Sequence, residues 1–207
     1  MKTIIQTISG FLLVVAIIAG YITSTGVYNI AATEKHWLIT EKLIEWMRNN
    51  SIAARANTLE VPIMEETEYL AIGAAHYDAM CIICHLTPGE ESTELAQGLY
   101  PQAPVFYQRK SLTEPNAIEA QAKAYFWVIK NGLKMTAMPA WGLTHDDETI
   151  WAMTFFVQQL ESMTADQYRN LISMHENNGD HEHNHDHDHN RQNEHDSHHH
   201  NGSHHHN

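Results

Sequence analysis

Two cysteines and a histidine that stand within five residues of one another are the side chains whose types and spacing most clearly indicate chemistry. They lie in the run Cys81-Ile82-Ile83-Cys84-His85, and no other cysteine occurs among the 207 residues. In a helical turn the positions i, i+3 and i+4 lie on one face, so both thiols and the imidazole can meet one flat macrocycle. A C-x-x-C-H run is typical of covalent haem attachment. The pattern predicts one haem c, attached through Cys81 and Cys84, with His85 as an axial ligand of the iron.

Two other sites would use the same pair of cysteines. A thiol redox pair needs only the two thiols, and a zinc site would use them as half of its ligands. Zinc requires further cysteines or well-placed histidines. None stands nearby at a suitable spacing, so the sequence favours the haem interpretation.

A second stretch, residues 131–142, contains Met138 followed by Pro139. With this stretch and the C-x-x-C-H run, residues 65–175 resemble the class I c-type cytochromes, whose second axial ligand is a methionine commonly followed by proline. The resemblance implies Met138 as that ligand, and methionine with histidine is a known ligand pair of cytochromes c. Met135 is the alternative in the same loop, and His145 is a more remote one.

The resemblance also implies how the site is supported. Gly73 and Tyr77 stand eight and four positions before Cys81, as a glycine and an aromatic residue do in the family. There they allow a close crossing with a later helix, for which Phe156 fits best. A proline carbonyl in the family accepts a hydrogen bond from the outer nitrogen of the proximal histidine. Pro104 resembles that proline, and Pro101 is the alternative.

Helices must position these groups. Apolar periodicity predicts helices over residues 65–80 and 114–130. The run Thr144-His145-Asp146-Asp147 resembles a capping box that starts a third helix, and the run from Thr164 starts a short last helix that ends at Met174. Residues 86–111 are rich in proline, glycine and polar side chains and predict a long loop. We therefore expect an all-α class I cytochrome c fold, a small helical domain around one covalent haem, preceded by one transmembrane helix.

The N-terminal segment is apolar enough to cross a bilayer. Residues 4–22 carry no charge, and Lys2 precedes them. A cleaved signal peptide is the competing interpretation, and no convincing cleavage site follows. Either segment would export the rest of the chain, which predicts a bacterial inner-membrane anchor with the haem domain in the periplasm.

Residues 25–64 predict a neck that contains an amphipathic helix ending near Ala56. Its apolar stripe would pack on the haem domain, lie at the membrane surface or dock a partner. The expected organisation is a membrane anchor or uncleaved signal at 1–24, the amphipathic neck at 25–64, the haem domain at 65–175 and a tail at 176–207.

The tail contains twelve histidines among acidic and amide residues. This composition cannot form a core and predicts disorder. Imidazoles and carboxylates suit copper, nickel, zinc and cobalt ions. The candidate ligands are His181, His183, His185, His187 and His189.

The net charge of −13 argues against nucleic acid as a partner. A haem with both axial positions filled has no open site for a substrate, so no catalytic residue is predicted. We expect a single-electron carrier that docks redox proteins at an exposed haem edge, alone or as a subunit of an oxidoreductase complex. Two alternatives remain open: a metal-handling protein in which the tail is primary, and a haem enzyme or gas sensor if Met138 is displaced from the iron.

Overall fold

The computed structural model describes residues 1–179, and the regular elements within that range are all helical. The α-helices are α1 (Lys2–Thr25), α2 (Leu38–Ala56), α3 (Glu66–Met80), α4 (Ile82–His85), α5 (Glu94–Gly98), α6 (Pro115–Asn131), α7 (Asp147–Leu160) and α8 (Ala165–Gly179), with 3₁₀ turns at Phe106–Gln108 and Trp141–Leu143. No strand occurs in this part of the chain, which confirms the predicted all-α class.

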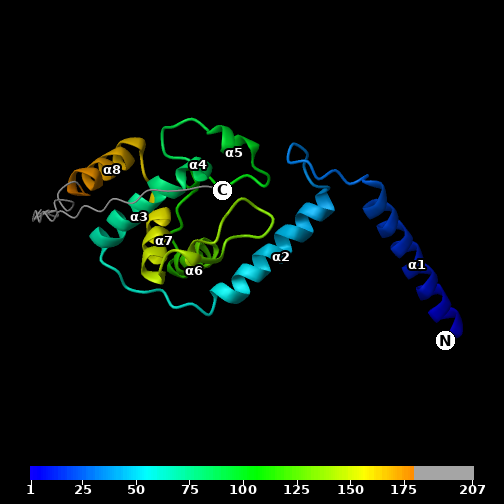
Figure 1. The fold of residues 1–207 in the computed structure, drawn as a ribbon. Helices are drawn as coiled ribbons and strands as arrows, with labels where there is room; N and C mark the ends of the chain where they lie inside the picture. The colour runs from blue at the N-terminus through cyan, green and yellow to red at the C-terminus, as the bar shows by residue number, and fades with distance from the viewer. Residues whose placement is uncertain (180–207) are drawn as a thin grey trace, which may run out of the picture.

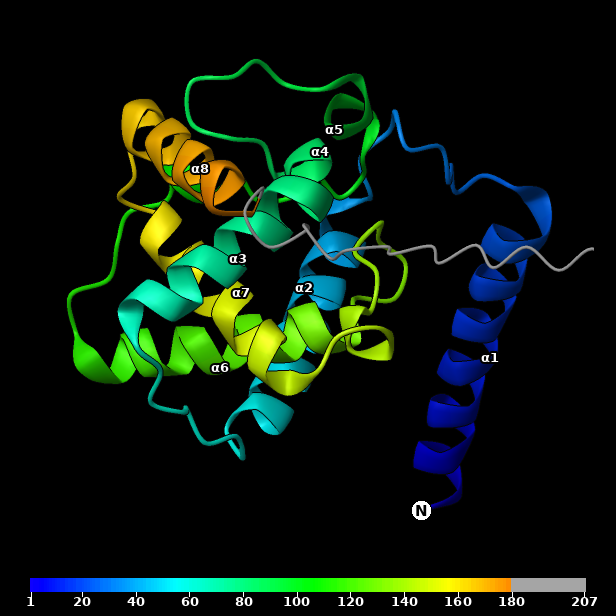
Figure 2. The same ribbon diagram turned by 60° about the vertical axis from the view of Figure 1, so that its left-hand side comes forward.

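Helix α1 stands apart from the other helices in both views (Figure 1, Figure 2). None of its 24 residues is buried, and at 1.5 Å per residue its length is about 36 Å, which exceeds a hydrocarbon core of roughly 30 Å. Among the described residues it is the one helix long and apolar enough to cross a membrane. This agrees with the predicted N-terminal span.

The centre of the fold is the crossing of α3 and α7, which pack against each other closely (Figure 2). A Cβ atom at Gly73 would lie 2.5 Å from the carbonyl oxygen of Ala152 and 2.5 Å from Cβ of Phe156. Only glycine leaves room for this approach. The rings of Tyr77 and Phe156 pack beside it with their centroids 5.4 Å apart. The predicted crossing with Phe156 is thereby confirmed.

Two further helices complete the packing around α3 and α7. Helix α6 packs on α7, where the rings of Phe126 and Trp151 stack with their centroids 4.1 Å apart. Helix α8 packs on α3, and the hydroxyl of its buried Tyr168 donates to Asp78 at 2.8 Å. The loops between these helices are therefore held at both ends by a packed core.

Helix α2, in the predicted neck, packs against α6. The stripe that turns inward is partly or fully buried and recurs every fourth residue: Ile44, Arg48, Ile52 and Ala56. An apolar stripe on the outer side remains between 59% and 78% exposed: Ile39, Leu43, Trp46 and Met47. One side of the neck helix thus packs on the domain, but most of the predicted apolar stripe, including Leu43, Trp46 and Met47, stays exposed.

The helix starts differ in one place from the prediction. The N-cap of α7 is Asp146, whose carboxylate accepts from the Thr149 amide at 2.9 Å. Thr144 was predicted to cap this helix, but its hydroxyl donates to the carbonyl of Trp141 in the preceding turn. This competition arises because short polar side chains also bond locally in turns.

The last helix begins as predicted. Thr164 accepts from the amide of Gln167 at 3.3 Å, and Gln167 accepts from the amide of Thr164 at 2.8 Å, which is a reciprocal capping box. Helix α8 continues to Gly179 instead of ending at Met174. The predicted tail ligands His181 to His189 lie outside the described residues.

Candidate haem site

The C-x-x-C-H run forms a helical turn directly after α3. The amides of Cys84 and His85 donate to the carbonyl of Cys81 at 3.1 and 2.8 Å. Leu86 then takes a positive φ of 63°, and its carbonyl accepts from the buried hydroxyl of Tyr77 at 2.7 Å. The turn is therefore tied back to the α3 helix, and this bond offsets the backbone strain of a non-glycine residue at positive φ.

The His85 ring is buried and fixed from two sides. Its Nδ1–H donates to the carbonyl of Pro104 at 2.9 Å, and the ring of Phe106 stacks on it at a centroid distance of 4.7 Å. Burial lowers the pKa of His85 below its ordinary value; the bond to Pro104 opposes this, and the nearby Arg109 charge adds to it. The imidazole is thus neutral at pH 7, with Nε2 left as an electron-pair donor.

The two cysteines are reduced thiols in a partly buried position. Burial chiefly, with a contribution from Cys84, raises the pKa of Cys81 to about 12. Reactive cysteines of thiol oxidoreductases have a depressed pKa instead. Among the side chains that the structure describes, no group of three or more histidine, cysteine or acidic residues could hold a metal ion. Both features disfavour the redox-pair and zinc alternatives.

The loop that carries Met138 folds back on the end of α6. The amide of Leu133 donates to the carbonyl of Met138 at 3.2 Å, and the amide of Met138 donates to the hydroxyl of Thr136 at 3.1 Å. Gly132 has φ 65°, and a Cβ there would lie 2.8 Å from the Met138 carbonyl oxygen. Glycine at this position is therefore required both by the backbone angle and by the close approach.

The two methionines of this loop face different surroundings. Met138 is half-buried and lines a cavity with Cys81, Cys84 and His85. Met135 has φ 59°, is 90% exposed and does not line that cavity. His145 also lies outside the cavity lining; it is half-buried, beside the rings of His76 and Trp141, and does not point fully into solvent as predicted.

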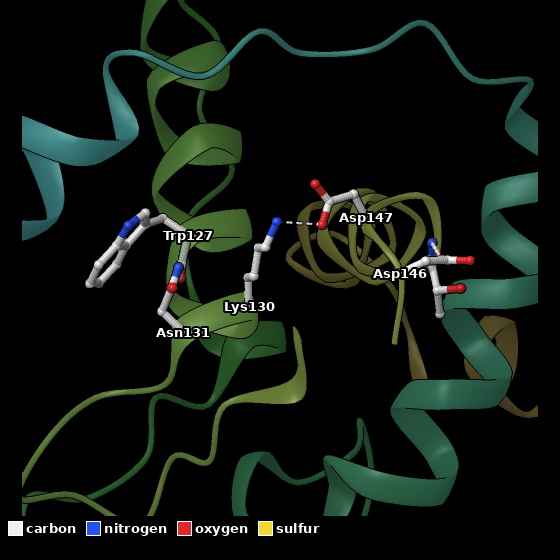
Figure 3. Close-up of polar contacts among 6 residues, drawn as sticks. Trp127, Lys130, Asn131, Asp146 and Asp147 are labelled. Atoms are coloured by element: carbon white, nitrogen blue, oxygen red, sulfur yellow. Dashed lines mark hydrogen bonds and ion pairs between the residues drawn. The ribbon is translucent and has the colours of Figure 1, made fainter. Parts of the chain in front are cut away.

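An ion pair closes the ends of the methionine loop (Figure 3). Lys130, at the end of α6, pairs with Asp147, at the start of α7, with Nζ 2.5 Å from Oδ1. In the same corner Asn131 donates to the carbonyl of Trp127 at 2.8 Å. The intervening residues, 131–146, thereby form a loop whose ends are held together.

The cavity has a volume of about 720 Å³ and is mainly apolar, within the roughly 300–1,000 Å³ of cofactor sites. It brings together all five residues predicted from the sequence: Cys81, Cys84, His85, Pro104 and Met138. Of the two prolines considered, both line the cavity, and Pro104 is the one whose carbonyl accepts from His85.

These groups fit a haem c. Two thiols lie three residues apart on one turn, a neutral imidazole beside them keeps a free nitrogen, and a thioether from a distant segment lines the same apolar cavity. Thioether attachment needs the thiols, and the iron takes imidazole and thioether ligands. The cavity therefore has the donor set and the apolar lining that such a group requires.

Comparison with known families gives the same result. Residues 69–157 match the family model described as cytochrome c oxidase, cbb3-type, subunit III. The chain carries a class I c-type cytochrome domain. No curated protein matches the chain. The matched range contains the C-x-x-C-H turn and Met138 but excludes α1, α2 and α8. The family match therefore assigns a haem cofactor and an electron-transfer role to this range.

Sequence reasoning missed several residues of this site. Phe106 was not predicted to belong to the site, yet its ring stacks on His85. Arg48, Asn49 and Ile52 of α2 line the cavity although they lie in the predicted neck. The sequence signal for Arg48 is a charged residue at the four-residue spacing that otherwise holds the apolar residues Ile44, Ile52 and Ala56.

Proposed function

We propose that this chain is a membrane-anchored single-haem electron carrier, with the haem attached through Cys81 and Cys84 and its iron ligated by His85 and Met138. The observation that carries the proposal is that these four side chains, from segments about fifty residues apart, line one apolar cavity. The cofactor would supply a reversible one-electron change of its iron.

The chain's own residues would set the conditions for that change. The Pro104 carbonyl holds the Nδ1 proton of His85, which leaves Nε2 directed to bind and makes the imidazole a stronger donor. Phe106 restrains the ring by stacking. A thioether from Met138 favours the softer ferrous ion and so raises the reduction potential relative to a second histidine.

Apolar residues at the mouth of the cavity would exclude water and serve as the docking rim. Ile83, Ala137 and Pro139 line the cavity, and Ile83 is 52% exposed. A small apolar rim permits brief contact with redox proteins, as the exchange of one electron requires. We infer that the haem domain lies on the periplasmic side of a bacterial inner membrane, held there by α1.

The description of the matching family names an oxidase subunit. We therefore include in the proposal that the chain works as the electron-entry subunit of a membrane oxidoreductase complex. Copurification of other subunits from detergent-solubilised native membranes, with reduced haem reoxidised in that complex, is the expected result.

The test compares two methionine variants, produced in a host that matures c-type haem. Met138→Ala should remove the weak sulfur-to-ferric-iron absorption band, lower the reduction potential and let added ligands bind the iron. Met135→Ala is the matched control, because this side chain leaves the same loop toward solvent. The reverse pattern, with the band lost only in Met135→Ala, would overturn the assignment of Met138.

Carbon monoxide separates the carrier from the enzyme and sensor alternatives. With both axial positions filled by the chain, the reduced wild-type protein should bind carbon monoxide slowly or not at all. Immediate binding would mean that Met138 is absent from the iron. Replacement of both Cys81 and Cys84 by alanine should leave any haem extractable from the denatured chain, and haem that resists extraction would contradict covalent attachment.

A further inference from the structure

The cavity has two cationic side chains in its lining, Arg48 and Arg109. Among the described residues that line it, there is no lysine and no acidic residue. This is unusual for a chain with 25 acidic and 12 basic residues. Arg48 is half-buried and Arg109 is exposed. A cation that is partly removed from water is favoured by a partner of opposite charge.

The two arginines differ in how far their donors are already used. Arg109 donates to the hydroxyl of Tyr125 at 2.6 Å, and its guanidinium lies 5.4 Å from the centroid of Phe106. That hydroxyl donates in turn to the buried Glu161 at 2.8 Å. Arg109 is thus part of a network that supports the ring stacked on His85.

Arg48 has no comparable partner. Its one hydrogen bond to a side chain is that from Nε to Asn49, at 3.3 Å, and no carboxylate among the side chains that the structure describes forms an ion pair with it. Glu45 lies on the same helix, but its pKa is lowered first by the hydrogen bond from Lys42, and the Arg48 charge is the smallest of its influences. The guanidinium donors of Arg48 remain available to the cavity.

Helix α2 directs Arg48 inward. Arg48 lies in the stripe of Ile44, Ile52 and Ala56 that packs toward α6, and Arg48, Asn49 and Ile52 all line the cavity. Arg55, one turn beyond Ser51, is exposed and bonds to the carbonyl and hydroxyl of Ser51 at 2.9 Å each. The two arginines of one helix therefore separate into one cavity residue and one surface residue.

We propose that Arg48 binds a carboxylate of the haem and that α2 is a wall of the haem site. The proposal rests on the proposed function, since it requires the cavity to hold haem. A haem carries two carboxylate groups, and the planar guanidinium matches a carboxylate with two parallel hydrogen bonds. Because α2 lies outside residues 69–157, the site extends beyond the family domain into the segment that follows the membrane anchor.

The consequence is electrostatic. Oxidised iron carries one more positive charge than reduced iron, so a fixed cation at the site favours the reduced state. At the midpoint potential of the wild type, Arg48→Gln should have a ratio of ferrous to ferric protein that is about three- to tenfold lower. For one electron this equals a fall in the reduction potential of roughly 30–59 mV. Arg48→Lys keeps the charge and should stay closer to wild type. Arg55→Gln is the matched control and should leave the potential unchanged.

A second measurement leaves both arginines of α2 in place. An arginine reagent labels two samples, and mass spectrometry measures the rate at each arginine. One sample is the haem-loaded protein. The other is the chain in which both cysteines are replaced by alanine and from which the haem has been extracted. We expect haem to slow the labelling of Arg48 at least threefold and to leave Arg55 unaffected. Equal labelling of Arg48 in both forms, or a potential of Arg48→Gln equal to that of Arg55→Gln, would overturn the proposal. So would equal potentials of Arg48→Lys and Arg48→Gln. Failure of the carrier function is seen separately, as wild-type protein without covalent haem.

Discussion

The close crossing of α3 and α7 gives a prediction whose magnitude can be worked from the structure. Gly73→Ala adds one methyl group at a point where its carbon would lie 2.5 Å from the carbonyl oxygen of Ala152. Ordinary contacts of this kind exceed 3.4 Å. Because the oxygen belongs to the backbone of α7, it cannot rotate away, and the two helices must separate.

Overpacking of a core by one or a few methyl groups costs about 1–3 kcal/mol. Alanine in place of glycine inside a helix stabilises the helix by ~1 kcal/mol, because alanine has the higher helix propensity. The backbone clash places the cost at the upper end, so the net loss of unfolding free energy is roughly 1–2 kcal/mol. For a small domain each 1 kcal/mol lowers the thermal midpoint by roughly 4–8 °C, so we expect a fall of about 4–16 °C.

The assay is thermal unfolding of the haem-loaded protein in detergent, followed by circular dichroism at the helix band. Gly98→Ala is the control, because a Cβ at Gly98, the last residue of α5, would meet no atom within 4 Å. The control should unfold at or slightly above the wild-type midpoint. If Gly73→Ala also unfolds there, α3 and α7 do not cross as closely as the structure places them, and the reasoning from Gly73 fails.

Two further predictions concern the supports of the haem site. Tyr77→Phe removes the buried hydrogen bond to the Leu86 carbonyl, which should lower the free energy of unfolding by about 1–3 kcal/mol in denaturant titrations; an unchanged midpoint would contradict a supporting role. Asp146→Ala removes the cap of α7. The hydrogen bond from the Thr149 amide is the chief cause that lowers the pKa of Asp146 in the folded protein. The wild type should therefore have the higher free energy of unfolding, by a difference that is full above the unfolded pKa of about 3.9 and disappears as the pH falls through the lower folded pKa. An advantage that persists with the carboxylate protonated would refute the capping role.

Much of this fold is local and was therefore readable from the sequence. The helix predicted at 65–80 is Glu66–Met80, and that at 114–130 is Pro115–Asn131. The backbone hydrogen bonds of the C-x-x-C-H turn join residues four apart or fewer. The all-α class and the cytochrome domain are confirmed, whereas the axial and attachment roles of the individual residues stay predictions. The cap at Thr144 was wrong because two neighbouring polar residues competed for the helix start.

The environment of each side chain was decided by contacts between segments far apart in the sequence. Met135 and Met138 are three residues apart and chemically identical, and only the turn at Gly132 leaves one in solvent and the other at the cavity. Amphipathic spacing predicted that one side of α2 would be covered, but periodicity contains no information about what covers it. The sequence by itself determined the helices and the C-x-x-C-H motif, since both depend on residues close along the chain. Tertiary packing alone decided that Arg48 of the neck faces the same cavity as His85, because that depends on α2 packing against α6.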